Sequence, residues 1–170
     1  EDGRYGFNNV NMTIKNNEIS NVNSDNVAYG VKVEQVKIKY GQDSWFPDVK
    51  ENTLVMNNII WGMESSNLEQ SRIGIRLFTE RTGVFDFLEA DIEDYYTWDD
   101  RVVNNTIIIP DDAGSTEGAI AGIAVQHSRA TKIMNNAIAM EDNLIDEDCP
   151  ASALIFYQGI LPGELHGLES

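Results

Sequence analysis

Apolar residues alternate with polar ones in three short segments of the chain, each of which contains a leading glycine. The segments are YGVKVEQ (29–35), IGIRLFT (73–79) and AGIAVQH (121–127). After each glycine an apolar residue stands at every second position, as Val31 and Val33 do on either side of Lys32. A period of two predicts a β-strand that buries one face. Helix caps and a 3.6-residue period are largely missing, so the pattern predicts an all-β protein.

An asparagine pair recurs four times in one setting, which reads Ile or Val, any residue, Asn, Asn, any residue, Ile. The copies are TIKNNEIS (13–20), LVMNNIIW (54–61), RVVNNTII (101–108) and KIMNNAIA (132–139). The asparagines are Asn16 and Asn17, Asn57 and Asn58, Asn104 and Asn105, and Asn135 and Asn136. Four chance matches at this stringency are not expected. The pattern therefore indicates an internal repeat.

Repeats of some tens of residues with strand content are typical of a β-solenoid. Asparagine tolerates the left-handed backbone that a sharp corner between strands requires. Stacked in successive coils, the eight amides would form a structural ladder along the axis, and the flanking β-branched residues would fill the core. The alternative, that the pairs merely mark surface turns, does not explain the regular flanking positions. We expect one all-β domain over residues 1–170, a parallel β-helix of about four to five coils with two long loops on one flank.

The phrases NNTI (104–107) and GIAV (122–125) resemble the coil repeat of the right-handed parallel β-helix family. That family includes pectate lyase-like proteins, polygalacturonases, alginate epimerases and phage tailspikes. The resemblance covers about residues 8–145. It implies the fold and its right hand, and a flank cleft of the kind in which family members bind polysaccharide. It does not select an activity, because enzymes and non-enzymes share the repeat.

The spacing between the asparagine pairs is uneven, at 41, 47 and 31 residues. The extra residues lie in two insertions, 36–56 and 80–103, which leave the predicted coils at the same corner and are expected to lie side by side. Most of the aromatic residues of the chain are in these insertions, together with many carboxylates. Aromatic rings stack on sugar rings and carboxylates accept hydrogen bonds from hydroxyls. The predicted ligand-binding residues are Tyr40, Asp43, Trp45, Phe46, Tyr95, Tyr96, Trp98, Asp99 and Asp100. The alternative is a satellite core beneath the two loops.

The net charge of −16 makes a nucleic-acid partner or an anionic membrane surface improbable, because both require clustered cations. The acidity fits a solvating surface of a marine, saline or extracellular protein, or calcium sites built from carboxylates. Asp91, Glu93 and Asp94 are the candidate metal ligands, and Ca²⁺ is the one cofactor to consider. The single cysteine, Cys149, can form no internal disulfide. The chain begins without Met, which we interpret as a processed or truncated chain.

Catalytic motifs are incomplete. Asp99-Asp100, Asp111-Asp112 and LHGLES (165–170) loosely resemble the acidic and His-Gly motifs of polygalacturonases, but the expected Asn-Thr-Asp and Arg-x-Lys segments are missing. A lyase would pair calcium-binding acids with an arginine base, for which the candidates are Arg72, Arg76, Arg81 and Arg101. His127 and His166 are far apart in the sequence and neither is part of a nucleophile motif, so we expect structural roles for both.

Three functions remain open. The first, which we prefer, is a non-catalytic carbohydrate-binding or adhesive module that is extracellular, on the cell surface or on a virion. The second is a structural subunit of a viral or extracellular assembly, in which copies would join as a homo-oligomer through the open ends of the solenoid. The third is a fragment of a polysaccharide lyase or hydrolase.

Overall fold

The structure is a computed structural model that describes residues 11–38, 52–65, 71–82, 97–110, 120–126, 128–129, 131–140 and 151–157. Within these ranges the chain is all-β, and every pair of neighbouring strands is parallel. The described residues contain no helix that is long and apolar enough to cross a membrane.

Three four-stranded sheets account for most of these strands. The first sheet contains β1 (Met12–Lys15), β5 (Thr53–Met56), β10 (Arg101–Val103) and β14 (Lys132–Met134). The second contains β2 (Glu18–Ile19), β6 (Ile59–Trp61), β11 (Thr106–Ile109) and β15 (Ala137–Met140). The third contains β4 (Ala28–Ile38), β8 (Arg72–Thr82), β12 (Ile120–Gln126) and β16 (Ala151–Tyr157). Two short pairs complete the set, β3 (Val22–Ser24) with β7 (Met63–Ser65) and β9 (Thr97–Trp98) with β13 (Ser128–Arg129).

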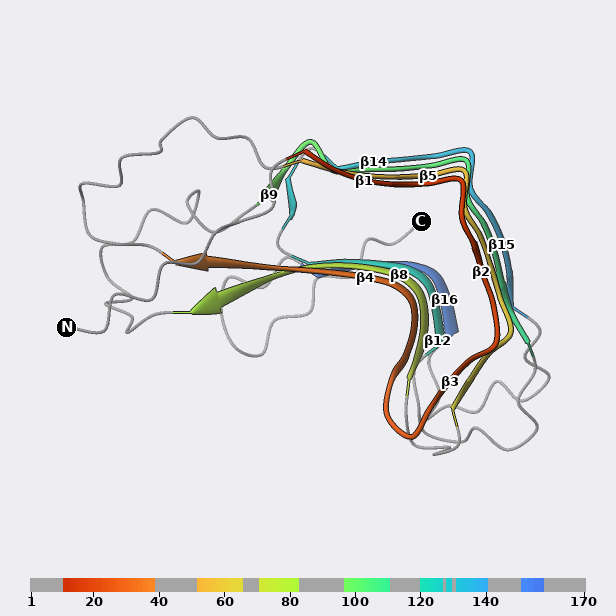
Figure 1. Cartoon of the computed structure of the whole chain (residues 1–170). Helices are drawn as coiled ribbons and strands as arrows, with labels where there is room; N and C mark the ends of the chain where they lie inside the picture. The colour runs from red at the N-terminus through yellow and green to blue at the C-terminus, as the bar shows by residue number, and fades with distance from the viewer. Residues whose placement is uncertain are drawn as a thin grey trace, which may run out of the picture.

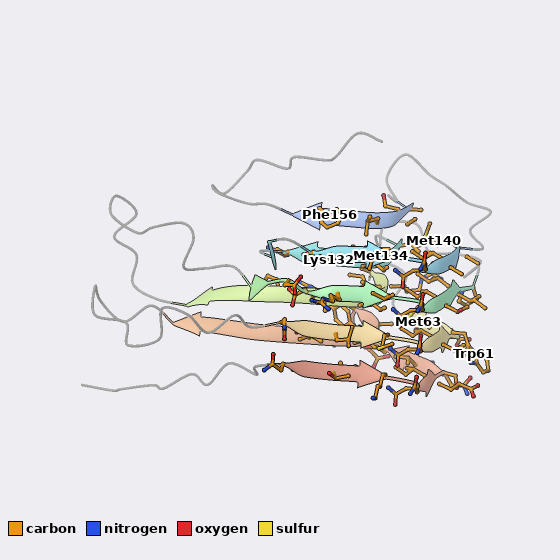
Figure 2. The ribbon with its side chains drawn as sticks, turned by 90° about the horizontal axis from the view of Figure 1, so that it is seen from above. Trp61, Met63, Lys132, Met134, Met140 and Phe156 are labelled. Atoms are coloured by element: carbon orange, nitrogen blue, oxygen red, sulfur yellow. The ribbon has the colours of Figure 1, made fainter. Side chains whose placement is uncertain are left out.

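Each of the three large sheets takes one strand from each of the four sequence repeats, in the order of the chain. Figure 1 looks along the stack, so that the strands of one sheet overlap, and Figure 2 shows the same layers from the side. The register aligns equivalent residues. Val55 lies opposite both Ile14 and Val102, and Ile60 lies opposite both Ile19 and Ile107.

The core lies between the three sheets and is built from these aligned columns. Val55 and Val102 of the first sheet and Ile60 and Ile107 of the second are fully buried. Each such side chain contributes roughly 2 kcal/mol of burial free energy. The equivalent residues of the first and fourth repeats, Ile14, Ile19, Ile133 and Ile138, are only partly buried, because each has a described neighbour on one side alone. The β-branched positions of the asparagine repeat therefore face the core.

The fourth repeat also has a strand in the third sheet, β16, although no glycine segment marks it in the sequence. β16 pairs in parallel with β12, and Ala153 stands opposite Gly122, between the partners Ser152 and Leu154. The apolar run near the C-terminus thus completes a fourth layer of this sheet.

The two long insertions begin and end in paired strands. β4 and β8 stay in register as far as Ile38 and Thr82, so the first three residues of each insertion extend the third sheet. The insertions return into the first sheet at β5 and β10, which also pair with each other. The points of departure are therefore adjacent, and so are the points of return. Residues 39–51 and 83–96 lie outside the described residues.

Candidate functional site

The strands of the third sheet bend, as β4, β8 and β12 show in Figure 1, and glycine makes the bend possible. A Cβ atom on Gly74 would lie 2.5 Å from the carbonyl oxygen of Gly122 and 2.5 Å from Cγ2 of Ile107. The core-facing direction at this position is therefore filled by the isoleucine of the following repeat. The next residue, Ile75, is also buried, so two successive residues face inward while the strands stay paired one to one across the bend.

The outer side of this bend is hollowed. Residues before the glycines and residues after them line one concave space of about 220 Å³, which we call the elbow hollow. Its lining residues are Val27, Tyr29, Ser71, Ile73, Arg76, Leu77, Ala121, Ala124, Gln126 and Ile155. They come from all four strands of the third sheet or from the residues just before them, so the hollow runs across the strands. The small side chains Ala121 and Ala124, both buried, help to make it concave.

Arg76 is held in place in the elbow hollow by two aromatic rings. Its guanidinium carbon lies 5.5 Å from the ring centroid of Tyr29 and 4.8 Å from that of Phe78. Its Nη1 donates a hydrogen bond of 2.5 Å to the hydroxyl of Tyr29. These contacts fix a planar group with five N–H donors in one orientation.

The charge of Arg76 is not neutralised by a carboxylate of the described residues, although the chain has 28 acidic residues and only 12 lysines and arginines. The neighbouring cation, Lys32, does have a carboxylate partner. It forms an ion pair of 2.5 Å with Glu34, and its Nζ lies 5.4 Å from the ring centroid of Tyr29. Arg76 therefore keeps hydrogen-bond donors for a bound molecule.

The elbow hollow has the composition of a binding site. Ile73, Ile155 and the two alanines provide apolar contact area, whereas Arg76 and Gln126 provide donors and an acceptor. Among the described residues no carboxylate lines it, and carboxylates are the groups that acid–base cleavage of a glycosidic bond uses.

The asparagine pairs form two columns with different roles. The first residue of each pair has a left-handed backbone, with φ between 53° and 58° at Asn16, Asn57, Asn104 and Asn135. These side chains are exposed. They turn the chain from the first sheet into the second, and we call this turn the asparagine corner. Asparagine is suited to it because its short polar side chain lowers the cost of the left-handed region.

The second residues, Asn17, Asn58, Asn105 and Asn136, form a continuous chain of side-chain hydrogen bonds. Nδ2 of each donates to Oδ1 of the next, over 2.9 Å at all three steps. The backbone N–H groups of Asn17, Asn58 and Asn105 donate to the same oxygens over 2.9 to 3.1 Å. In the two middle layers the amides are 1% exposed. The ladder thus pairs polar groups inside the corner that water cannot reach.

Most of the aromatic and acidic residues proposed from the sequence fall outside the described residues. These are the ligand-binding candidates Tyr40, Asp43, Trp45, Phe46, Tyr95 and Tyr96 and the metal-ligand candidates Asp91, Glu93 and Asp94. Asp111, Asp112, His127, Cys149 and His166 lie outside them as well. Trp98 belongs to β9. Within the described ranges no three His, Cys, Asp or Glu side chains come together as a metal site.

Asp99 and Asp100, the remaining ligand-binding candidates, both take part in the corner that leads into the first sheet. Asp99 has a left-handed backbone with φ of 59° and forms ion pairs of 2.7 Å with Lys132 and 2.5 Å with Arg101. The hydrogen bonds from Lys132 and then from Arg101 lower the pKa of Asp99 to about 2. Asp100 is 2% exposed, and its Oδ1 accepts a hydrogen bond of 2.8 Å from the backbone N–H of Thr53. Both carboxylates have structural partners, and a role in ligand binding stays a prediction.

The four arginines considered as bases have different surroundings. Arg72 is 1% exposed and donates from Nη1 to the carbonyl oxygen of Pro110 over 2.9 Å, which suits a structural role. Arg101 is paired with Asp99. Only Arg76 among the three whose side chains are described lies in a hollow. Tyr29 and Gln126, which share that hollow, carry no motif that distinguishes them from other outward-facing strand residues.

Comparison of the chain with known protein families, curated proteins and solved structures gives no match. The elbow hollow and the asparagine ladder are thus interpreted from their own geometry.

Proposed function

We propose that the chain is a right-handed parallel β-helix and that it acts as a non-catalytic carbohydrate-binding or adhesive module. The in-register stacking of corresponding strands in three parallel sheets supports the solenoid architecture. The resemblance of the coil repeat to the β-helix family supports the right hand. The acidic composition supports an extracellular, cell-surface or virion location, with no nucleic-acid or membrane partner.

The observation that carries the proposed function is the clamped Arg76 in the elbow hollow. A sugar offers hydroxyls that accept hydrogen bonds from a guanidinium and an apolar C–H face that packs on small or aromatic side chains. The hollow provides both kinds of group, and it runs across the strands, so an extended chain of sugars can follow the stack. The aromatic and acidic insertions leave the same sheet at Ile38 and Thr82 and are proposed to extend this surface.

The test is a glycan-array assay of the whole chain with neutral and acidic glycans, with and without Ca²⁺, followed by mass analysis of the bound sugar. Arg76→Gln keeps the first two methylene groups and a polar end, but it shortens the side chain and removes the charge and most donors. We expect affinity for the best glycan to fall by about tenfold or more, the value of a lost charged hydrogen bond. The control is Lys15→Gln, which removes an exposed cation of the first sheet outside both insertions and should leave affinity unchanged.

Each other result opposes the proposal in a different way. Equal losses in Arg76→Gln and Lys15→Gln would place the ligand elsewhere. Shortened sugars in the mass analysis would support the lyase or hydrolase alternative. Calcium-dependent glycan binding that Arg76→Gln does not weaken would place the ligand on the acidic insertions and not in the elbow hollow. Failure to bind any glycan would favour a structural subunit, an alternative supported by the exposed apolar side chains of the second sheet.

A further inference from the structure

The outer side of the second sheet carries an unusual concentration of exposed apolar side chains. Ile59 is 48% exposed, Trp61 38% and Ile108 36%, and only two other large apolar residues of the described chain are exposed to this degree. Ala137 and Ala139 of β15 are exposed beside them. We call these five residues the apolar face. Trp61 lies at the outer edge of the stack in Figure 2.

The register arranges the apolar face as a regular grid. Ile59 of β6 lies opposite Thr106 of β11, which in turn lies opposite Ala137 of β15. In the second row Trp61 lies opposite Ile108, which lies opposite Ala139. Both rows run along the stack without an interruption in pairing, so this part of the sheet has no bulge.

The grid changes from large to small side chains along the stack. β6 and β11 present Ile59, Trp61 and Ile108, and β15, one strand spacing of about 4.8 Å further, presents only alanines. A two-fold axis that lies in the plane of the interface and runs parallel to the strands turns the second copy over and reverses the direction of its stack. The large side chains of one copy then lie over the alanines of the other. The face is therefore complementary to itself, which is what a symmetric dimer interface requires.

Charge opposes the association of two copies least at the apolar face. Two chains of net charge −16 repel each other, and the repulsion is weakest where the facing surfaces carry few carboxylates. In the two rows the only charged residue is Glu18, opposite Ile59 on β2. Its Oε1 accepts a hydrogen bond of 3.3 Å from Nε1 of Trp61, which holds the indole over the face.

From these observations we propose that the apolar face is the interface of a symmetric homodimer. The two stacks associate side to side through their second sheets, a contact distinct from the association through the open ends that the sequence predicts. An apolar patch of a few hundred Å² is smaller than the ~800 Å² per partner of a standard stable interface. The dimer is accordingly a reversible one that forms at high protein concentration.

The first measurement is sedimentation velocity of the whole chain from about 5 to about 500 μM, a range suited to a weak contact. We expect a monomer–dimer equilibrium that shifts toward dimer between about 20 mM and 500 mM NaCl. The shift follows because salt screens the repulsion between the two negative chains and leaves apolar contact intact. A monomer at every concentration and salt would overturn the proposal, as would a dimer that salt dissociates.

Three variants distinguish this interface from non-specific apolar association. Ile108→Glu should lower the dimer association constant by about tenfold or more, as expected when charge enters the centre of an apolar contact. Ala139→Trp should lower it as well, because the new ring occupies the space that receives the partner's large side chains. Met134→Glu is the matched control, since Met134 is 47% exposed on the first sheet and should leave the constant unchanged.

Far-ultraviolet circular dichroism establishes that each variant is folded, and the outward position of residue 139 makes Ala139→Trp compatible with folding. Stronger dimerisation of Ala139→Trp would mean non-specific apolar association and would overturn the proposed packing. A dimer that persists in both Ile108→Glu and Ala139→Trp, or one that Met134→Glu dissociates, would place the interface elsewhere.

Discussion

The asparagine corner and the glycine bend both redirect the chain within each layer, and they do so with opposite chemistry. At the corner between the first and second sheets, every layer contributes a side-chain amide that bonds to the amide of the next layer. At the bend within the third sheet, the first three layers contribute no side chain at all. The isoleucine of the following repeat fills the space, as Ile107 does beside Gly74.

Both devices join one layer to the next, which explains why the asparagine pair and the glycine segment recur together in the sequence. A change at either position is expected to disturb two layers, because its partner belongs to a different repeat. The fourth repeat supports this interpretation at the bend. Ala153 replaces glycine there, and β16 is the edge strand of its sheet, so no described isoleucine of a following repeat packs against it. In the described layers, glycine stands where an isoleucine of the following repeat packs against the bend.

The largest effect is expected from Asn105→Ala, in the buried part of the ladder. This change removes the acceptor of the backbone N–H and Nδ2 of Asn58, and the donor to the carbonyl oxygen of Val55. Each buried group left without a partner costs about 1–3 kcal/mol, so unfolding free energy should fall by about 4 kcal/mol. Urea unfolding followed by circular dichroism measures it. A loss below about 1 kcal/mol would mean that water replaces the missing amide.

A somewhat smaller loss is expected from Gly74→Ala at the bend. The added Cβ meets a backbone oxygen and a core side chain at 2.5 Å, and neither can move without shifting its own layer. Overpacking of this kind costs about 1–3 kcal/mol. The reverse change in the fourth layer, Ala153→Gly, is the control and should cost no more than about 1 kcal/mol, the backbone-entropy cost of a glycine. Equal effects of the two changes would remove the distinction between inner and edge layers.

The exposed column of the asparagine corner should be less sensitive than the buried one. Asn104→Ala keeps the ladder but places alanine at φ of 54°, which costs about 1–2 kcal/mol. Asn104→Gly should recover most of that loss, because glycine adopts this backbone freely. Asn105→Gly should recover nothing, since the ladder needs the amide. Rescue by glycine at both positions would show that the two columns have the same role.

The repeat itself could be predicted from the sequence, because identical residues recur with the same neighbours. The different roles of the two asparagines in each pair could not be predicted. Asn104 and Asn105 have the same side chain, and either can adopt a left-handed backbone or bond to another amide. Only the pairing of strands shows which amide lies inside the corner. The fourth strand of the third sheet could not be predicted for a different reason. Ala153 replaces the glycine that marks the other three segments.

The elbow hollow was harder to predict from the sequence than the fold. Tyr29 and Arg76 are 47 residues apart in the sequence and occupy ordinary outward positions of two neighbouring strands, and a bend in the sheet brings them together. The pattern singled out Arg76 only as one of four possible bases. Conversely, Asp99-Asp100 is an adjacent carboxylate pair in the sequence, but the corner separates an ion-paired side chain from a buried one. Adjacent residues at a corner need not share a site.

The smallest expected effect concerns the acidic corner residue Asp99, which has the left-handed backbone of the asparagine corner but uses ion pairs in place of a ladder. Hydrogen bonds from Lys132 and Arg101 lower its pKa from 3.8 to about 2. The folded state therefore binds this proton less readily than the unfolded state. The resulting stabilisation is present above about pH 4 and is lost as the pH falls to about 2.

Asp99→Asn tests this link because asparagine tolerates the left-handed backbone and cannot titrate. The urea midpoints of the wild type and Asp99→Asn should differ slightly at about pH 6 and converge as the pH falls through about 4 to 2. The difference should shrink in high salt, since both ion pairs are exposed to solvent. A difference that is independent of pH would show that Asp99 acts through its backbone conformation alone, and the acidic corner would then work as the asparagine corner does.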